Sequence, residues 1–235
     1  MTNRNRKSVL VTGAGSGIGR AVALRFAGTG AVLTLAGRRR PPLEQTADLV
    51  RERGGDALVH PVDITDADAV CALADAVVGR FAGVDVLVNC AAIASVANTP
   101  DMAVDTATAM IATNCTGALH LARAVWPHLQ ARGGGIIINL SSMASYDPFE
   151  GLGVYGATKS FVNLLTQAMA AEGKSDNIAV FAVAPGAVDT PMLRGLFPDF
   201  PRDRCLSPGE VADLIATLTQ PECRYSTGQT VRIQK

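Results

Sequence analysis

Three residues in the second half of the chain have the types and spacing of a proton-transfer site. Tyr155 and Lys159 are four residues apart, so on a helix they share a face, where an ammonium can stabilise a tyrosinate. An ordinary tyrosine has a pKa of about 10, and general acids work best nearer the operating pH, so we expect Lys159 to lower the pKa of Tyr155. Ser142 follows the apolar run 135–140, a buried strand candidate, and its hydroxyl can hold a substrate oxygen beside the phenol.

A tyrosine and a lysine at this spacing also arise by chance on amphipathic helices, so the rest of the chain decides their meaning. The segment from Thr12 to Gly19 is rich in glycine, follows the apolar run 8–11 and precedes the helically spaced run 20–27. Glycines let the backbone turn tightly and approach a pyrophosphate, which the N–H groups of a helix N-terminus attract. Because Ile18 replaces the last glycine of the generic pattern, the spacing is Thr-Gly-x-x-x-Gly-x-Gly. The segment predicts a dinucleotide site; the alternative is a tight turn without a ligand.

The end of the second expected strand indicates which dinucleotide is bound. A site for NAD places a carboxylate about 20 residues after the glycines, on the adenosine ribose. Here Gly37 occupies that position, Arg38 and Arg39 follow, and the first acid is Glu44 on the next helix. A guanidinium binds a 2′-phosphate through charge-assisted bonds, so we predict NADP(H) rather than NAD(H). The alternative, arginines that are only surface charge, applies first to Arg39 or Arg40.

Taken together, the motifs resemble the short-chain dehydrogenase/reductase family of the single-domain kind, and the resemblance covers essentially the whole chain. The landmarks in family order are Thr12 to Gly19, Asp63, Asn89-Cys90-Ala91-Ala92, Asn114, Ser142, Tyr155 with Lys159, and Pro185-Gly186 followed by Thr190. The resemblance implies an active tetrad of Asn114, Ser142, Tyr155 and Lys159, with Ser142 preferred to Ser141 because the family serine lies thirteen residues before the tyrosine. One motif departs from the family, because Ala92 replaces a glycine and its methyl crowds the adenosine side.

The resemblance also implies individual roles. In relatives the backbone carbonyl of the asparagine at Asn114 holds a water that links the lysine to solvent, the Asp63 carboxylate meets the adenine amino group, and the lysine bonds the nicotinamide ribose. Asn114 could instead be a buried asparagine satisfied by neighbouring backbone, and Asp63 could cap a loop. The expected cofactor contacts are Gly13, Gly15, Ser16, Gly17, Ile18, Gly19, Arg38, Arg39, Asp63, Ile64, Asn89, Ala91, Tyr155, Lys159, Pro185, Gly186, Val188 and Thr190.

The elements that position these residues alternate as in an α/β protein with a doubly wound, Rossmann-type parallel sheet and helices on both faces. We expect about seven strands, near 8–12, 31–36, 57–60, 84–89, 135–140, 178–183 and 229–233. Helices are expected near 18–28, 42–53, 66–80, 102–110, 113–131, 155–171 and 208–219. The last begins with a capping box at Ser207 and Glu210. With no repeat or linker, we expect a single dinucleotide-binding oxidoreductase domain over residues 1–235.

Composition excludes several other functions. The 235 residues are 48% hydrophobic and 18% charged, with zero formal net charge and 5% aromatic residues, so one core is expected and a nucleic-acid surface is not. The five cysteines and three histidines are scattered, which argues against a metal site and for a reducing cytoplasm. Cys90 and Cys115 are expected to be buried as small apolar residues. The apolar stretch after the basic residues Arg4, Arg6 and Lys7 is too short for a signal peptide or membrane anchor, so we expect a solvated N-terminal end.

The mechanism expected is hydride transfer between NADP(H) and a carbonyl or secondary alcohol, with Tyr155 as general acid or base. The substrate stays open among an acyl thioester, a steroid, a sugar and a small ketone. The region between Pro191 and Ser207 is expected to form an apolar lid through Met192, Leu193, Leu196, Phe197 and Phe200, facing a wall of Met143, Tyr146, Phe149 and Leu152.

Two other functions stay possible. A non-catalytic NADP-binding sensor of the same fold would not need all four tetrad residues, and a nucleotide-sugar epimerase or dehydratase normally has a longer C-terminal region. The resemblance further implies a homodimer or homotetramer through helices 113–131 and 155–171, whose apolar stripes contain Leu119, Ala122, Val125, Trp126, Phe161, Leu164, Leu165 and Ala168.

Overall fold

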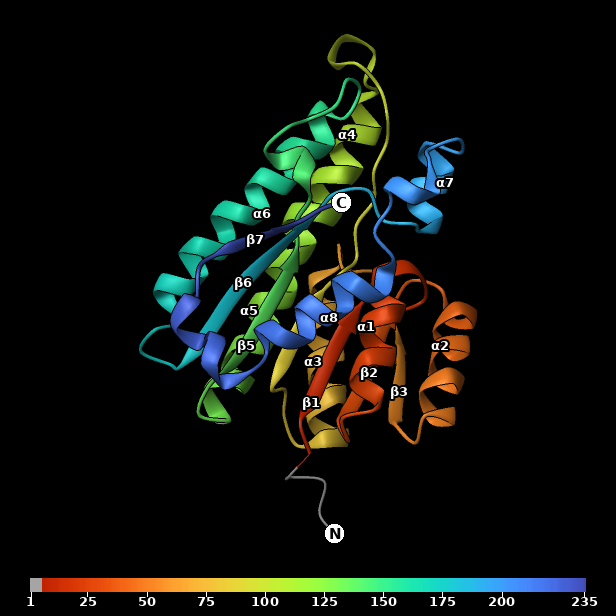
Figure 1. Cartoon of the computed structure of the whole chain (residues 1–235). Helices are drawn as coiled ribbons and strands as arrows, with labels where there is room; N and C mark the ends of the chain where they lie inside the picture. The colour runs from red at the N-terminus through yellow and green to blue at the C-terminus, as the bar shows by residue number, and fades with distance from the viewer. Residues whose placement is uncertain (1–5) are drawn as a thin grey trace.

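A seven-stranded parallel sheet organises the chain in the computed structural model, which describes residues 6–235 (Figure 1). The strand order is β3-β2-β1-β4-β5-β6-β7, and every neighbouring pair is parallel. The strands are β1 (Ser8–Thr12), β2 (Val32–Gly37), β3 (Asp56–Pro61), β4 (Val86–Asn89), β5 (Gly135–Leu140), β6 (Ile178–Pro185) and β7 (Thr230–Ile233). The order reverses between β1 and β4, where doubly wound sheets open a crevice at the carboxyl ends of the strands. The predicted fold class is confirmed.

Helices cover both faces of this sheet. One face carries α1 (Gly17–Ala27), α2 (Arg40–Glu52) and α8 (Pro208–Leu218), and the other carries α3 (Ala67–Phe81), α5 (Gly117–Ala131) and α6 (Gly153–Glu172), with α4 (Val104–Ile111) beside α6. The short α7 (Pro191–Leu196) stands apart from both layers, above the strand ends in Figure 1. Further single turns lie at Thr99–Asp101, Met143–Ser145, Arg202–Arg204 and Pro221–Ser226. The fold thus leaves α7 free to cover a site at the sheet edge.

The two layers bury separate apolar cores because successive strand residues point to opposite faces. On β1, Val9 and Val11 pack toward α1, whereas Leu10 packs toward α3 and α5, and all three are fully buried. Fully buried strands on both faces explain the nearly continuous apolar runs in the sequence.

Helix starts follow the expected local chemistry. Ser207 and Glu210 form the predicted capping box, and the Asp66 carboxylate accepts bonds from two backbone N–H groups at the start of α3. The helix expected at 42–53 begins earlier, at Arg40, because prolines are tolerated in a first turn.

Two expectations about helices are corrected. The break expected between helices 102–110 and 113–131 is absent, because a π-helical turn, Ala112–Thr116, joins α4 to α5 without interruption. Helix α7 was not expected at all, since its six residues are too few for an apolar period to be recognised.

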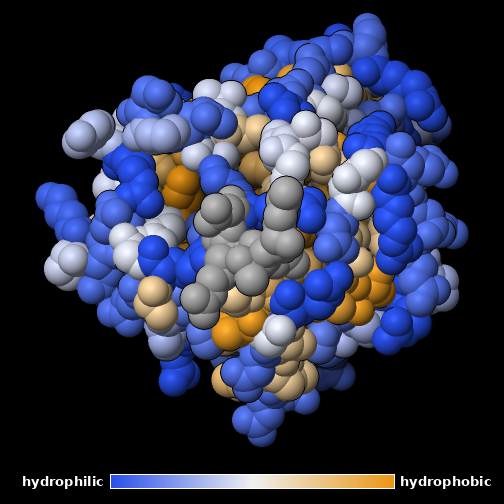
Figure 2. Space-filling view, turned by 90° about the horizontal axis from the view of Figure 1, so that it is seen from below, coloured by the Kyte–Doolittle hydropathy of each residue, from blue (hydrophilic) through white to orange (hydrophobic). Residues whose placement is uncertain are grey.

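The N-terminal end is less solvated than expected where the structure describes it. Arg4 lies outside the described residues, but the Arg6 guanidinium donates to the carbonyls of Gly30 and Ala31 at 2.8 and 3.2 Å. Figure 2 shows this end of the molecule, where polar side chains cover most of the visible face and separate small apolar patches. None of the helices in the described residues is long and apolar enough to cross a membrane.

Candidate active site

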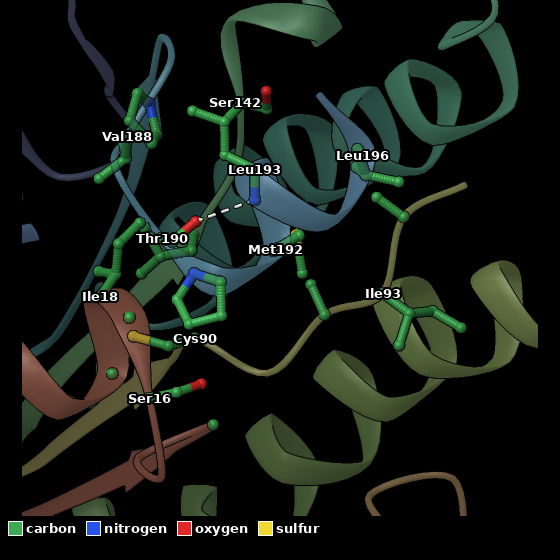
Figure 3. Close-up of a pocket in the computed structure, with 18 of the residues that line it drawn as sticks. Ser16, Ile18, Cys90, Ile93, Ser142, Val188, Thr190, Met192, Leu193 and Leu196 are labelled. Atoms are coloured by element: carbon green, nitrogen blue, oxygen red, sulfur yellow. Dashed lines mark hydrogen bonds between the residues drawn. The ribbon is translucent and has the colours of Figure 1, made fainter. Parts of the chain in front are cut away.

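A cleft of about 890 Å³ lies along the carboxyl edge of the sheet. It runs from the glycine turn before α1, past the ends of β4 and β5, to α7. Figure 3 shows Ser16 and Ile18 on one side of the opening, and Met192, Leu193 and Leu196 of α7 on the other. One continuous cleft therefore contains both a dinucleotide-type turn and an apolar cover.

The glycine turn packs so closely against neighbouring chain segments that side chains would not fit there. Gly13 has φ +63°, and a Cβ there would meet the Ala91 backbone at 3.0 Å. A Cβ on Gly19 would come within 2.4 Å of the Gly13 carbonyl oxygen, so only glycine lets α1 begin this close to the turn. All six predicted residues of the turn, Gly13, Gly15, Ser16, Gly17, Ile18 and Gly19, line the cleft.

Two polar side chains, one on α1 and one on α2, form hydrogen bonds to the backbone of the glycine turn. The Arg20 guanidinium donates to the Gly15 carbonyl at 2.6 Å and to the Thr46 hydroxyl at 3.0 Å. The Thr46 hydroxyl in turn donates to the Ala14 carbonyl at 2.9 Å. The sequence did not indicate these bonds, which tie two carbonyls of the turn to side chains of α1 and α2.

Two arginines without salt bridges among the described residues line the cleft next to the glycine turn, at the end where the sequence predicts the adenosine. Arg38 and Arg39 are exposed and line it, and neither side chain forms a salt bridge or hydrogen bond within residues 6–235. Arg40, by contrast, pairs with Glu44 at 3.4 Å. Asp63 and Ile64 also line the cleft, and their predicted contact with the adenine stays a prediction. Backbone and side-chain hydrogen bonds from Thr65, together with the nearby Arg38 charge, lower the pKa of Asp63 against a smaller opposing effect of burial.

The catalytic candidates Ser142 and Tyr155 meet at the middle of the cleft. Ser142 begins the turn after β5, and its Oγ accepts a bond from the Ala144 N–H at 3.1 Å. Burial raises the pKa of Tyr155 to about 12, and the neighbouring Ser142 hydroxyl partly opposes this by favouring the phenolate. The expectation that the pKa of Tyr155 is lowered is therefore wrong for the described residues.

The position of Lys159 explains why the pKa of Tyr155 is raised rather than lowered. Its ammonium is buried and donates to the Leu140 carbonyl at 2.7 Å, with Nζ 5.7 Å from the centre of the Tyr155 ring. Burial lowers the pKa of Lys159 to about 8, while the neighbouring thiols of Cys90 and Cys115 act in the opposite direction. The ammonium is directed at a backbone carbonyl and sits beside the ring, so burial dominates the pKa of the phenol.

Asn114 lies just beneath the cleft, in the π-helical turn. Its side-chain oxygen accepts from the Ile93 N–H at 2.9 Å, and its Nδ2 donates to the Ile93 carbonyl at 2.9 Å and to the Thr158 hydroxyl at 3.0 Å. The side chain is thus satisfied by neighbouring backbone, as one of the two interpretations of the sequence allowed. It fixes the loop after β4, which forms part of the cleft wall.

Asn89 is the one predicted cofactor contact that does not line the cleft. Its side chain points into the core and donates to Asn139 at 2.9 Å, and Asn139 donates to Thr166 at 2.9 Å. Asn89 belongs to strand β4, and of the residues that follow it, Cys90, Ala91 and Ala92 line the cleft, so a direct contact of Asn89 with a cofactor stays a prediction. A small internal cavity lined by Asn89, Asn114 and Lys159 lies beneath.

The segment after β6 forms the next part of the wall. Pro185, Gly186, Val188 and Thr190 all line the cleft as predicted. The Thr190 hydroxyl accepts a bond from the Leu193 N–H at 3.2 Å and so caps α7 (Figure 3). The same segment thereby shapes the cleft and starts the helix that covers it.

The lid, defined here as residues 191–206, lies where expected. All five predicted lid residues and three of the four opposite-wall residues line the cleft. The prediction for the fourth, Tyr146, is wrong, because this residue does not line the cleft. Its ring is exposed and lies under the Arg232 guanidinium, 5.3 Å from the ring centre. Residues that the sequence did not indicate at this end are Ile93, Asp147, Asp203, Arg204, Gln234 and Lys235.

Comparison with known proteins identifies the family. The model of the short chain dehydrogenase family matches residues 7–200. An uncharacterized oxidoreductase of Staphylococcus epidermidis is 34% identical over 222 residues, which cover 94% of this chain and 94% of that protein. The chain belongs to the short-chain dehydrogenase family, whose members of this type are oxidoreductases.

Two solved structures are similar over nearly their full length. The 3-ketoacyl-(acyl-carrier-protein) reductase from Brucella melitensis, complexed with NADH, has a TM-score of 0.88 and 30% identity, covering 97% of this chain and 96% of that one. A variant of actinorhodin polyketide ketoreductase, with NADPH, has a TM-score of 0.92 and 30% identity, covering 100% of this chain and 98% of that one.

Proposed function

We propose that the protein is an NADPH-dependent reductase of carbonyl compounds that also oxidises the corresponding secondary alcohols. The observation that carries this proposal is the position of Ser142, Tyr155 and Lys159 in the same cleft as the glycine turn. A proton donor and a dinucleotide turn on one sheet edge suit a reaction that moves a hydride and a proton together.

The cleft residues fit a nicotinamide dinucleotide. Its pyrophosphate would lie on the glycine turn at the N-terminus of α1, a turn whose close packing depends on glycine. Asp63 and Ile64 would hold the adenine, and Val188 and Thr190 the carboxamide. Bound there, the dinucleotide would supply the hydride. The NADH and NADPH carried by the two similar reductases support this choice.

The chain's own residues manage the proton. With its pKa raised to about 12, Tyr155 keeps its proton at neutral pH and can donate it to the oxygen of a carbonyl as that oxygen becomes an alkoxide. The Ser142 hydroxyl holds the same oxygen. The Lys159 ammonium, 5.7 Å from the ring centre, leaves a positive charge near the phenolate that forms, an effect smaller than the burial that raises the pKa of the resting phenol. Asn114 keeps the surrounding loop in place through its bonds to Ile93.

The preference for NADPH rests on Arg38, with Arg39 beside it. Both side chains line this end of the cleft, and neither has a salt-bridge partner among the described residues, although the Arg38 charge acts at longer range on Asp63. A 2′-phosphate would provide that partner, whereas NADH offers only neutral hydroxyls.

The substrate pocket has apolar side chains on both walls, with the charged residues Asp147, Asp203, Arg204 and Lys235 also in its lining, which favours a carbonyl compound with an apolar body and a polar end. The test is a panel of acyl thioesters, steroids, sugars and small ketones assayed with NADPH and NADH through the nicotinamide absorbance. Consumption of cofactor in proportion to product supports a reductase. Cofactor binding without consumption would support a sensor, and product formation without net consumption would support an epimerase.

The proposed enzyme is one domain over 1–235 that works as a homodimer or homotetramer in the cytoplasm. On α6, Phe161 and Leu164 are 42% and 67% exposed, although apolar, whereas Ala122 and Val125 of α5 are buried against the sheet. Large apolar side chains left in solvent on one helix favour association. Sedimentation at micromolar concentration tests this, and a monomer would contradict it.

A further inference from the structure

One carboxylate at the lid end of the cleft receives two guanidinium groups. Asp189 lies between Val188 and Thr190, the residues placed on the cofactor side. Its Oδ1 accepts from Arg194 Nε at 2.7 Å, and its Oδ2 accepts from Arg202 Nη1 at 3.0 Å. Arg194 belongs to α7 and Arg202 to the next turn, so Asp189 joins the cofactor segment to two separate parts of the lid.

Arg194 also joins parts of the lid to one another. Its Nη1 donates to the Phe200 carbonyl at 2.6 Å, and its Nη2 contacts the Cys205 sulfur at 3.6 Å. Its backbone N–H donates to the Thr190 carbonyl at 3.0 Å. The side chain is 22% exposed, and a single guanidinium thus connects the beginning, middle and end of the lid.

The lid has little else to hold it. Helix α7 contains no buried residue, because its apolar side chains line the cleft instead of entering a core. The far end is fixed by a bridge between Val188 and Leu206, through Asp189 N–H to Leu206 O at 2.9 Å and Leu206 N–H to Ala187 O at 2.8 Å. Between these anchors, the bonds of Arg194 provide the main tie.

We propose that Arg194 is a positioning residue that holds the lid over the substrate end of the cleft, and that Asp189 couples the lid to the cofactor segment. The proposal deepens the proposed function, because it rests on a carbonyl substrate beneath the lid. Arg194 does not touch the reacting atoms; it sets where Met192, Leu193 and Leu196 lie against them.

A kinetic experiment measures the effect on substrate and cofactor separately. In Arg194→Ala, we expect the KM of the best carbonyl substrate to rise about tenfold, kcat to change less than about threefold, and the Kd of NADPH to stay within about twofold. Arg194→Lys keeps the charge near Asp189 but lacks the planar fork, so its KM should lie between those of the wild type and Arg194→Ala. An unchanged KM in Arg194→Ala would overturn the proposal.

The matched control is Arg25→Ala. Arg25 Nε donates to Asp213 Oδ1 at the same 2.7 Å, but the side chains are 47% and 66% exposed and lie on α1 and α8, away from the cleft lining. We expect Arg25→Ala to leave KM, kcat and Kd within about twofold of the wild type, as for an exposed ion pair. An equal rise in KM in this control would count against a specific role of Arg194.

Limited proteolysis tests the lid without any need for activity, so it separates this proposal from the proposed function. Trypsin cleavage after Arg202 and Arg204, lid sites that the wild type and all three variants share, should be about fivefold faster in Arg194→Ala and Asp189→Asn than in the wild type or Arg25→Ala, as located by mass spectrometry. Thermal midpoints within about 4 °C of the wild type would exclude global unfolding. Cleavage at the wild-type rate in both lid variants would overturn the proposal even if the enzyme proves to be a reductase.

Discussion

The glycine-turn end and the lid end of the cleft are held in place by different forces. At the glycine turn, backbone packs on backbone: Gly19 lies against the Gly13 carbonyl, and Arg20 and Thr46 secure the carbonyls of Gly15 and Ala14. At the lid, α7 buries no residue, and its position depends on charged side chains gathered around Asp189. Packed backbone has few alternative arrangements, whereas partly exposed side-chain ion pairs can break and form again without disturbing a core.

This difference corresponds to the chemistry proposed at each end. A dinucleotide always presents the same pyrophosphate and ribose, so a rigid turn suits it. A lid lined by Met192, Leu196 and Phe197 can adapt to the shape of an apolar substrate. We infer that cofactor affinity depends on packing at the turn and that substrate affinity depends on the polar contacts of the lid.

The largest effect is expected where the two ends meet. Tyr155→Phe removes the proton donor but keeps the ring, so kcat should fall by about 10²–10⁴-fold while the Kd of NADPH stays nearly unchanged. Tyr225→Phe is the matched control, because Tyr225 is 97% exposed and should keep wild-type activity. Near-normal turnover of Tyr155→Phe, measured by steady-state kinetics, would remove Tyr155 from the mechanism.

An added methyl group at the glycine turn should weaken dinucleotide binding without disturbing the lid end of the cleft. In Gly19→Ala the new Cβ would lie 2.4 Å from the Gly13 carbonyl oxygen, so the turn must shift. We expect the Kd values of both NADPH and NADH, measured by fluorescence titration, to rise about a hundredfold.

Gly28→Ala serves as the control for this variant. Gly28 follows α1 with φ −74°, and a Cβ there has no neighbour within 4 Å. Its dinucleotide affinities should match those of the wild type. If Gly19→Ala binds both dinucleotides normally, the packed turn is not what determines cofactor affinity.

Removing one arginine should distinguish the two cofactors. Arg38→Ala should raise the Kd of NADPH about ten- to hundredfold and leave that of NADH nearly unchanged, since only the 2′-phosphate loses a charge-assisted partner. Arg40→Ala, in which the arginine paired with Glu44 is lost, should change neither value. Isothermal titration provides both constants; tighter binding of NADH than of NADPH by the wild type would contradict the preference.

The smallest effect expected is a pH dependence from Lys159. Its folded-state pKa is lowered from 10.5 to about 8, so the ammonium that supports Tyr155 loses its proton as the pH rises through that value. For reduction, kcat/KM should be level near pH 7 and fall about tenfold by about pH 9, with Tyr155 still protonated. Conversely, burial of this cation opposes folding, so its contribution to stability should become more favourable above about pH 8. A rate that stays level to about pH 10 would contradict this role.

Much of the fold was predictable because the local signals agreed with one another. The apolar runs gave seven strands close to their observed bounds, and the capping box at Ser207 and Glu210 is present as predicted. The sequence predicts helices 102–110 and 113–131 as separate elements, with Asn114 near the start of the second, where an asparagine competes with the helix backbone for hydrogen bonds. In the fold, that side chain bonds with Ile93 and Thr158 instead of competing with its own helix, and a π-helical turn continues the chain.

The sequence by itself determined which residues gather at the cleft, because parallel strands bring their carboxyl ends to one edge and the motifs follow those strands. It did not determine where each side chain points. Only the tertiary structure turned Asn89 into the core and placed Tyr146 under Arg232. The directions of the pKa shifts of Tyr155 and Lys159 could not be predicted from the sequence pattern. Both shifts are caused mainly by burial, which arises only when the helices pack against the sheet. The pairing of Arg194 and Arg202 with Asp189 could not be predicted either. The lid has no regular spacing of apolar residues, so its conformation depends on contacts that form only in the folded protein.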